Sequence, residues 1–143
     1  MPEERYTVPL GKARVHREGA DVSVITWGAM VYTAAEAAEQ LESDGVSVEV
    51  IDLRTVMPWD RAAVLESVRK TSKALVLHED TRTGGFGAEI AATIAEEAFE
   101  DLDAPVKRIA APDTPVPFSP PLEKAFIPQV DDVTAGLREL AEY

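Results

Sequence analysis

The sequence contains no cysteine. Disulfides, thiolate zinc sites and cysteine nucleophiles are therefore excluded, and a cytoplasmic location is expected. No apolar run approaches the length that spans a bilayer, and the N-terminal residues, MPEERYTVPLGKA, lack the apolar core of a signal peptide. Neither export nor a membrane partner is predicted.

Basic residues are also scarce, because 14 Lys and Arg stand against 26 Asp and Glu, for a net charge of −12. Such a surface repels phosphate backbones, so nucleic acid is not expected as a partner. The same charge would steer a basic protein toward the chain, whereas surplus acid also keeps a domain soluble without any partner. Composition alone favours the second interpretation.

Short β-branched runs alternate with segments of helical period, which predicts a parallel α/β sheet covered by helices on both faces. At 143 residues the chain is expected to form a single domain, with residues 1–10 as a linker remnant. Asp60 is the expected N-cap of the second helix. Strands are expected at 12–17, 22–27, 46–51, 73–78 and 105–110, and helices at 30–43, 60–70, 86–100, 122–126 and 132–142.

The first two expected strands are joined by only four residues, Glu18 to Asp21. A parallel crossover needs a dozen residues or more, so residues 12–17 and 22–27 are expected to pair as antiparallel neighbours. After the last strand comes a proline-rich segment, APDTPVPFSPPLE, which is expected to run extended because each proline lacks a donor and restricts the residue before it.

Ligands of open parallel sheets bind beyond the carboxyl ends of the strands, which directs attention to Gly28 and to His78. Gly28 follows the second strand, but no glycine-rich nucleotide motif surrounds it, so a tight turn is the favoured interpretation. His78 precedes two carboxylates and the sequence TGGFG. Acid/base chemistry or a metal would need further ligands or a nucleophile, so a structural or interface role is favoured there.

A third candidate site is a group of acidic residues near the end of the third helix and at the C-terminus. Considered alone, these residues form a solvated face, and considered as a patch they would accept an Arg- and Lys-rich partner through charge-assisted hydrogen bonds. Spacing does not decide whether they meet in space. The residues are Glu97, Glu100, Asp101, Asp103, Glu139, Glu142 and the Tyr143 carboxylate.

Four phrases, taken together, resemble one family: VPLGKARVHREGADVSVITWG, VEVIDLRTVMPWD, LVLHEDTRTGGFGAEIA and DAPVKRIAAPDTPVPFSPPLEKAFIP. The chain resembles the C-terminal, transketolase-C-type domain of the beta subunit of thiamine-diphosphate-dependent 2-oxoacid dehydrogenases. The resemblance implies a three-layer α/β/α fold with a five-stranded, mostly parallel sheet whose first strand is antiparallel. It also implies a multienzyme complex that oxidatively decarboxylates a branched-chain 2-oxoacid or pyruvate, and HEDTRTGGFGAEI looks more like the branched-chain type.

In that family thiamine diphosphate and Mg²⁺ lie outside this domain, so no catalytic, cofactor or metal residue is assigned here and the isolated domain is expected to be inactive. The resemblance implies an alpha subunit and a second beta subunit as partners, with His78, Gly84, Gly85 and Phe86 near subunit contacts.

The resemblance further implies that Asp103 and the Tyr143 carboxylate dock a basic subunit-binding domain of the lipoyl acyltransferase. The alternative, from another class, is a stand-alone ligand-binding or regulatory domain that uses the carboxyl ends of the strands.

Overall fold

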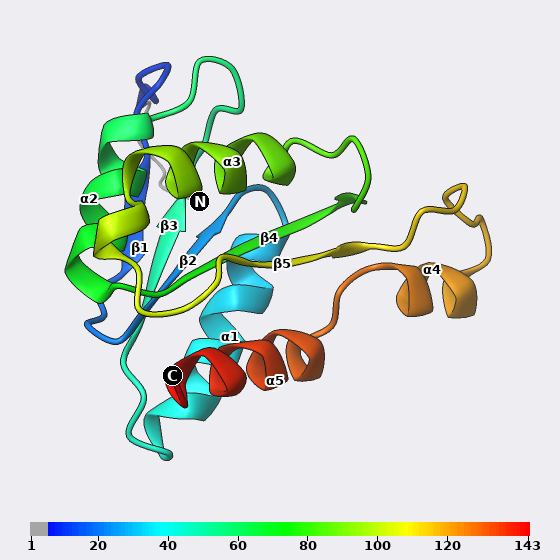
Figure 1. The fold of residues 1–143 in the computed structure, drawn as a ribbon. Coiled ribbons are helices and arrows are strands. Elements are labelled where there is room, and N and C mark those ends of the chain that lie inside the picture. The colour runs from blue at the N-terminus through cyan, green and yellow to red at the C-terminus, as the bar shows by residue number, and fades with distance from the viewer. Residues whose placement is uncertain (1–5) are drawn as a thin grey trace.

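The computed structural model describes residues 6–143, which form one five-stranded sheet between two layers of helices (Figure 1). The strands lie in the order β1-β3-β2-β4-β5. They are β1 (Arg14–Arg17), β2 (Val22–Thr26), β3 (Val48–Asp52), β4 (Ala74–Thr81) and β5 (Lys107–Ala111). The helices are α1 (Met30–Glu42), α2 (Arg61–Thr71), α3 (Gly87–Glu97), α4 (Pro120–Phe126) and α5 (Val130–Ala141), with a 3₁₀ turn η1 (Phe99–Asp101).

Alternate residues of each buried strand supply the two cores, because successive side chains of a strand point to opposite faces. Leu75 and Leu77 of β4 pack beneath α1 and α5, whereas Ala74 and Val76 pack beneath α2 and α3. These residues are all fully buried, which explains why the strands read as continuous apolar runs. The predicted three-layer α/β/α fold with an antiparallel first strand is confirmed.

The predicted pairing of the first two strands is wrong. β1 pairs with β3, not with β2, and it does so antiparallel, with Val15 opposite Ile51. β2 lies inside the sheet between β3 and β4 and is parallel to both. The short connection therefore reverses the direction of the chain, as expected, but β3 lies between the two strands that it joins.

Gly19 makes this passage possible. The connection runs across the start of β3, where the amides of Ala20 and Asp21 both donate to the Ser47 carbonyl, at 3.1 and 2.8 Å. A Cβ atom on Gly19 would overlap the main chain of Val48 and Glu49. Only glycine fits this close approach of two backbones. The connection length set the strand direction, but it did not set which strand would be the neighbour.

A buried polar network fixes α2 against the sheet. The side chain of Glu49 accepts a hydrogen bond from Ser67 at 2.7 Å and forms an ion pair with Lys70. Ser67 lies 2.6 Å from the hydroxyl of Ser23 on β2. Hydrogen bonding to Glu49 and Glu18 raises the pKa of Lys70 to about 12. Because the buried carboxylate of Glu49 is bound by Ser67 and Lys70, its charge lies inside the domain without being left unpaired.

The other predicted features largely hold within the described residues. Asp60 caps α2 by accepting from the amide of Ala63 at 3.3 Å. The proline-rich residues 112–119 contain no helix or strand, and α4 lies apart from the main body in Figure 1. Of the expected linker remnant 1–10, residues 1–5 lie outside the described part, and residues 6–9 belong to no regular element.

Candidate functional site

His78 is the centre of a packed cluster at the carboxyl end of β4. Its ring is fully buried and stacks on Trp27, with the ring centroids 5.4 Å apart and the planes inclined by 8°. Phe86 meets Trp27 edge-on at 6.0 Å and Trp59 edge-on at 6.4 Å. Both tryptophans of the chain therefore pack in this cluster, which joins β2, β4 and the start of α3.

Two of the glycines in the TGGFG segment are required by close contacts: Gly85 lies against the Thr81 carbonyl oxygen and the His78 ring, and Gly87 lies against the His78 ring. A Cβ atom on Gly85 would lie 2.7 Å from Cε1 of His78, and one on Gly87 would lie closer still to Cδ2 and Nε2. Gly84 has a different reason, since its φ of +77° is a conformation that other residues rarely adopt. The segment is thus a close-packed cradle for an aromatic ring, and glycine identity follows from contact rather than from flexibility.

The His78 ring is held uncharged. Burial lowers the pKa of His78 from its ordinary value of 6.5, and the charge of Arg108 acts in the same direction, while Asp80 opposes both. Neither ring nitrogen has a hydrogen-bond partner among residues 6–143. Glu79 and Asp80 are exposed. A proton-transfer role is poorly supported by a ring that contacts no solvent and no neighbouring acid or base.

Because His78 is enclosed by its own chain, it cannot touch a neighbouring subunit directly. Gly84 is exposed and Phe86 is partly exposed. If this region contacts another subunit, these two residues supply the surface and His78 holds the segment in shape. The interface assignment of His78, Gly84, Gly85 and Phe86 stays a prediction.

The structure brings Asp103 and Tyr143 to the same end of the sheet. Asp103 lines a hollow with Pro105 and Val106, and Tyr143 lines an adjoining hollow with the same two residues. Both side chains are exposed, and the amide of Asp103 is anchored to the carbonyl of Ser72 at 2.8 Å. The two predicted docking residues thus flank the start of β5, which spacing alone did not show.

The rest of the acidic group is only partly available to a partner. Asp101 pairs with Arg69 at 3.3 Å, and Glu97 and Glu139 pair with Arg61 and Lys107. Asp103, by contrast, forms no ion pair with residues 6–143. An approaching cation would therefore meet its charge unneutralised, together with that of the exposed Glu100, which also forms no ion pair with residues 6–143.

An apolar hollow beside Asp103 was missed by the sequence reasoning. Phe99 on η1 is 74% exposed and lines a hollow of about 680 Å³ together with Leu102 and two alanines of α3. Large exposed aromatic side chains beside a concave surface are typical of protein contacts. The only signal in the sequence was an aromatic residue between acidic ones at a helix end.

Gly28 lies in the tight turn that was predicted for it, with a φ of +63°. It also lines a hollow of about 450 Å³ at the carboxyl ends of β2 and β3, together with Arg14, Asp52 and Arg54. This hollow offers room for the alternative ligand-binding function. Among residues 6–143 no group of three His, Asp or Glu side chains is placed to hold a metal ion.

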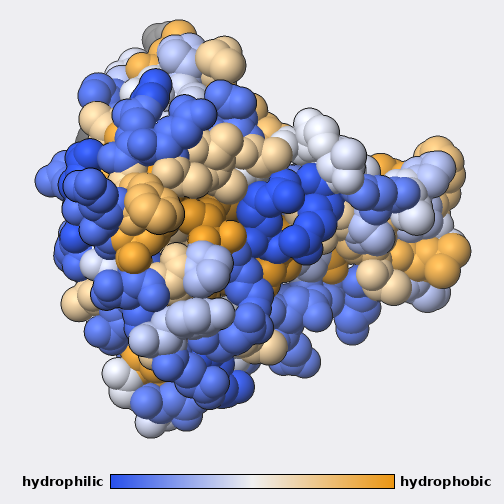
Figure 2. Space-filling view, viewed as in Figure 1, coloured by the Kyte–Doolittle hydropathy of each residue, from blue (hydrophilic) through white to orange (hydrophobic). Residues whose placement is uncertain are grey.

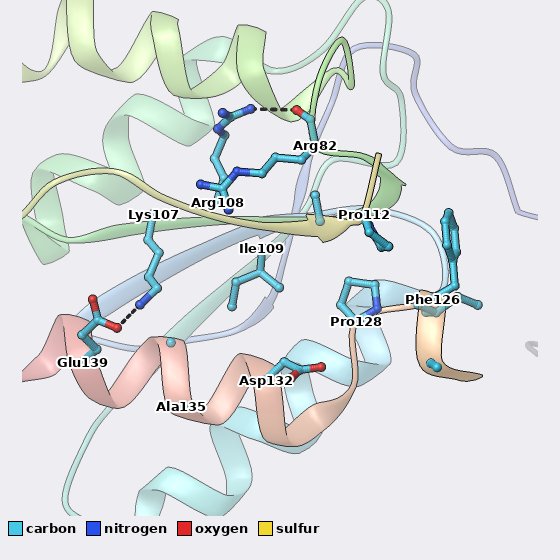
Figure 3. Close-up of a pocket in the computed structure, with 14 residues that line it drawn as sticks. Arg82, Lys107, Arg108, Ile109, Pro112, Phe126, Pro128, Asp132, Ala135 and Glu139 are labelled. Atoms are coloured by element: carbon cyan, nitrogen blue, oxygen red, sulfur yellow. Dashed lines mark hydrogen bonds and ion pairs between the residues drawn. The ribbon is translucent and has the colours of Figure 1, made fainter. Parts of the chain in front are cut away.

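Another cleft lies at the opposite edge of the sheet, beside β5, and is drawn in Figure 3. It has a volume of about 470 Å³ and lies between β5, α4 and α5. Arg82, Lys107 and Arg108 line it, and the sequence reasoning did not anticipate it. Its lining residues extend from Arg82 to Glu139, 57 positions apart in the chain, so no local motif predicts it.

The model of the transketolase C-terminal domain family matches residues 11–133. The chain belongs to this family. It is 50% identical over its whole length to the 2-oxoisovalerate dehydrogenase subunit beta of Bacillus subtilis, and 48% identical to the pyruvate dehydrogenase E1 component subunit beta of the same organism. It spans 44% of the length of each of these relatives.

Solved structures agree on the fold of this transketolase C-terminal domain. A split-gene transketolase, described as an inactive beta4 tetramer, superposes with a TM-score of 0.82 at 29% identity, covering 99% of this chain and 44% of that one. A 2-oxoglutarate:ferredoxin oxidoreductase from Magnetococcus marinus matches at a TM-score of 0.60 and 14% identity, covering 91% of this chain and 19% of that one. The second likeness extends to the fold alone.

Within the family domain, the features described above fall into three places. The His78 cluster lies at the carboxyl ends of the strands, Asp103 and Tyr143 lie at the start of β5, and the cleft follows the edge of β5.

None of the helices formed by residues 6–143 combines the length and apolar character that crossing a bilayer requires.

Proposed function

We propose that this chain is the C-terminal part of a 2-oxoacid dehydrogenase beta subunit and that it supplies surfaces for the assembly of the complex. The observation that carries the proposal is 50% and 48% identity to two such beta subunits over the whole of the chain. Because the chain spans 44% of their length, we assign thiamine diphosphate, Mg²⁺ and the decarboxylation chemistry to the remainder of the subunit.

The proposed substrate of the parent enzyme is a branched-chain 2-oxoacid or pyruvate. The two identities differ by too little to separate these substrates. Proposed partners are an alpha subunit, a second beta subunit and the basic subunit-binding domain of a lipoyl acyltransferase.

Asp103 and Tyr143 are the proposed docking residues for the basic domain. Support comes from their common position beside Pro105 and Val106, the absence of an ion pair at Asp103 within residues 6–143, and the net charge of −12. The exposed ring of Phe99 next to Asp103 adds apolar area to the surface. An acidic rim around an apolar hollow is complementary to a basic domain that also carries an apolar residue.

The test is the affinity of the chain for a purified subunit-binding domain, measured by calorimetric titration at several salt concentrations. Asp103→Lys is expected to weaken binding at least tenfold, because it replaces attraction by repulsion at the contact. The matched control is Glu36→Lys, which makes the same charge change on the exposed face of α1. Equal loss in both variants, or binding that is indifferent to salt and to Asp103→Lys, would contradict the docking proposal.

The alternative ligand-binding function makes its own prediction at the hollow around Gly28. A small anion held there by Arg14 and Arg54 would raise the melting temperature of the chain by linkage. A thermal-shift series with carboxylates and phosphates tests this, and an unchanged melting temperature across the series would leave the alternative without support.

A further inference from the structure

The outer edge of β5 combines features that none of the functions considered above uses. β5 is the last strand of the sheet, and no strand formed by residues 6–143 pairs with its outer side. An edge strand presents unpaired backbone N–H and C=O groups, which can pair with an added strand. The cleft of Figure 3 and the hollow beside Tyr143 share Arg82, Lys107 and Arg108, so a continuous groove follows this edge.

The two sides of this groove differ in chemistry. Figure 3 shows Arg82 and Arg108 on the side of β5 that faces α3, and Ile109, Phe126 and Pro128 on the side that faces α5. Figure 2 shows a strongly hydrophilic patch over the middle of this face of the molecule, with hydrophobic surface beside it. One side of the groove is therefore basic. The other side combines these apolar side chains with Lys107, Glu139 and Asp132, whose charged groups are paired or hydrogen-bonded within residues 6–143.

The basic side has uncommitted charge. Arg108 donates to the main-chain carbonyl of Arg82 at 3.1 Å, which leaves its charge without a carboxylate. The guanidinium of Arg82 forms no ion pair with residues 6–143. The two guanidinium groups thus lie together without a direct carboxylate partner, although, alongside hydrogen bonds from Thr83, the charge of Arg82 also acts on Asp113 and lowers the pKa of that carboxyl. Lys107, on the apolar side, is already paired with Glu139.

We propose that the β5 edge is a docking site for an extended segment of a partner protein in which acidic residues alternate with apolar ones. A strand added to β5 would point successive side chains to opposite sides. Carboxylates on one side would meet the guanidinium groups of Arg82 and Arg108, which bind carboxylates through paired hydrogen bonds. Apolar side chains on the other would enter the cleft against Ile109, Phe126 and Pro128.

A second copy of β5 is a poor occupant of the same edge. Pairing two β5 strands would bring the two Lys107 and two Arg108 side chains into one five-residue ladder, and like charges close together destabilise a strand pair. The basic edge thus discourages self-association and selects an acidic strand. The proposal differs from the docking of a basic domain at Asp103 and Tyr143, because the two sites call for partners of opposite charge. They meet only at the hollow that Tyr143 lines at one end of the groove.

The test uses a fluorescein-labelled hexapeptide in which glutamate alternates with valine, and its binding to the 143-residue chain is measured by fluorescence polarisation. Two peptides serve as controls: one with lysine in place of glutamate, and one with three glutamates followed by three valines. The alternating acidic peptide is expected to bind at least tenfold more tightly than either. Equal binding of the block and alternating peptides would overturn the proposal, as would no binding at millimolar peptide.

Variants locate the site. Arg82→Ala combined with Arg108→Ala is expected to weaken binding of the alternating peptide at least tenfold. Arg14→Ala, which removes the same kind of side chain from β1 at the opposite edge of the sheet, is expected to change it less than twofold. Circular dichroism confirms that each variant is folded. Equal effects at the two edges would refute the assignment to β5.

Two further outcomes identify a different occupant. Displacement of the peptide by millimolar succinate would indicate a site for small carboxylates and would overturn the proposal of a strand. Sedimentation analysis that shows a dimer of the chain, strengthened when Arg108→Ala removes the like charges, would assign the edge to a second copy and would overturn it as well. A monomer that retains the peptide in succinate supports the proposal.

Discussion

Replacement of Gly87 by alanine tests whether His78 and the glycine segment form one rigid unit. The new methyl group would overlap Cδ2 and Nε2 of the His78 ring and lie 3.1 Å from Val76. The ring cannot retreat, because it stacks on Trp27. Overpacking of this kind costs about 2 kcal/mol, and the better helix propensity of alanine returns up to about 1 kcal/mol. A net loss of about 1 kcal/mol is expected.

The matched control is Gly136→Ala, because Gly136 also lies within a helix and also faces the core. Its added methyl group would lie 2.7 Å from Cδ1 of Ile109, which is the free end of a flexible side chain. Ile109 can rotate away, so the gain in helix propensity should offset the contact. We expect the melting temperature to fall by about 3 °C in Gly87→Ala and to stay within about 1 °C of the parent in Gly136→Ala.

A double-mutant cycle with His78→Ala identifies the cause. Once the imidazole ring is removed, the methyl group of Gly87→Ala enters free space, so the substitution should become neutral or stabilising. Chemical denaturation of the four proteins should yield a coupling energy above about 1 kcal/mol between the two positions. Equal destabilisation by Gly87→Ala with and without the ring would refute the claim that glycine is required there by contact with His78.

The other predictions concern pH, capping and charge. Since the pKa of His78 is lowered from 6.5 by burial, the unfolded chain takes up a proton that the native chain does not. Stability should therefore fall as pH drops below 6.5, and denaturation of His78→Gln should show a smaller fall. Asp60→Ala removes the cap of α2 and the 3.1 Å bond from the amide of Ala13, and it should cost about 1 to 2 kcal/mol, whereas Asp60→Asn should retain more stability. The double variant Asp103→Lys/Arg108→Ala should change the free energy of binding to the basic domain by the sum of the two single changes, as measured by calorimetry.

The strands and helices were predictable because each buried element has an apolar pattern that depends only on its own residues. Val22 to Thr26 is buried at every position, and α2 begins after a cap, Asp60, that local chemistry dictates. The neighbour of β1 was not predictable in this way. It depended on Gly19 passing against the backbone of Glu49, a contact between residues 30 positions apart.

The candidate sites divide in the same manner. The sequence pointed to His78 and to the glycines that follow it, but the reason for Gly85 and Gly87 is a stacked ring that only the fold places against them. Asp103 and Tyr143 were singled out through the resemblance, and their common position beside β5 needed the structure. The cleft at β5 could not be predicted, because its lining combines β5 with Arg82 after β4 and with residues of α4 and α5.

The additivity expected for Asp103 and Arg108 follows from the geometry of β5. Five positions separate them, a span of about 17 Å when fully extended, and their side chains line different hollows. At physiological ionic strength the screening length is about 8 Å, so the field of one exposed charge is weak at the other. A basic partner at the start of β5 and an acidic segment along its edge would therefore bind without competing for charge. A coupling above about 0.5 kcal/mol would instead mean that the two surfaces share an occupant or move together.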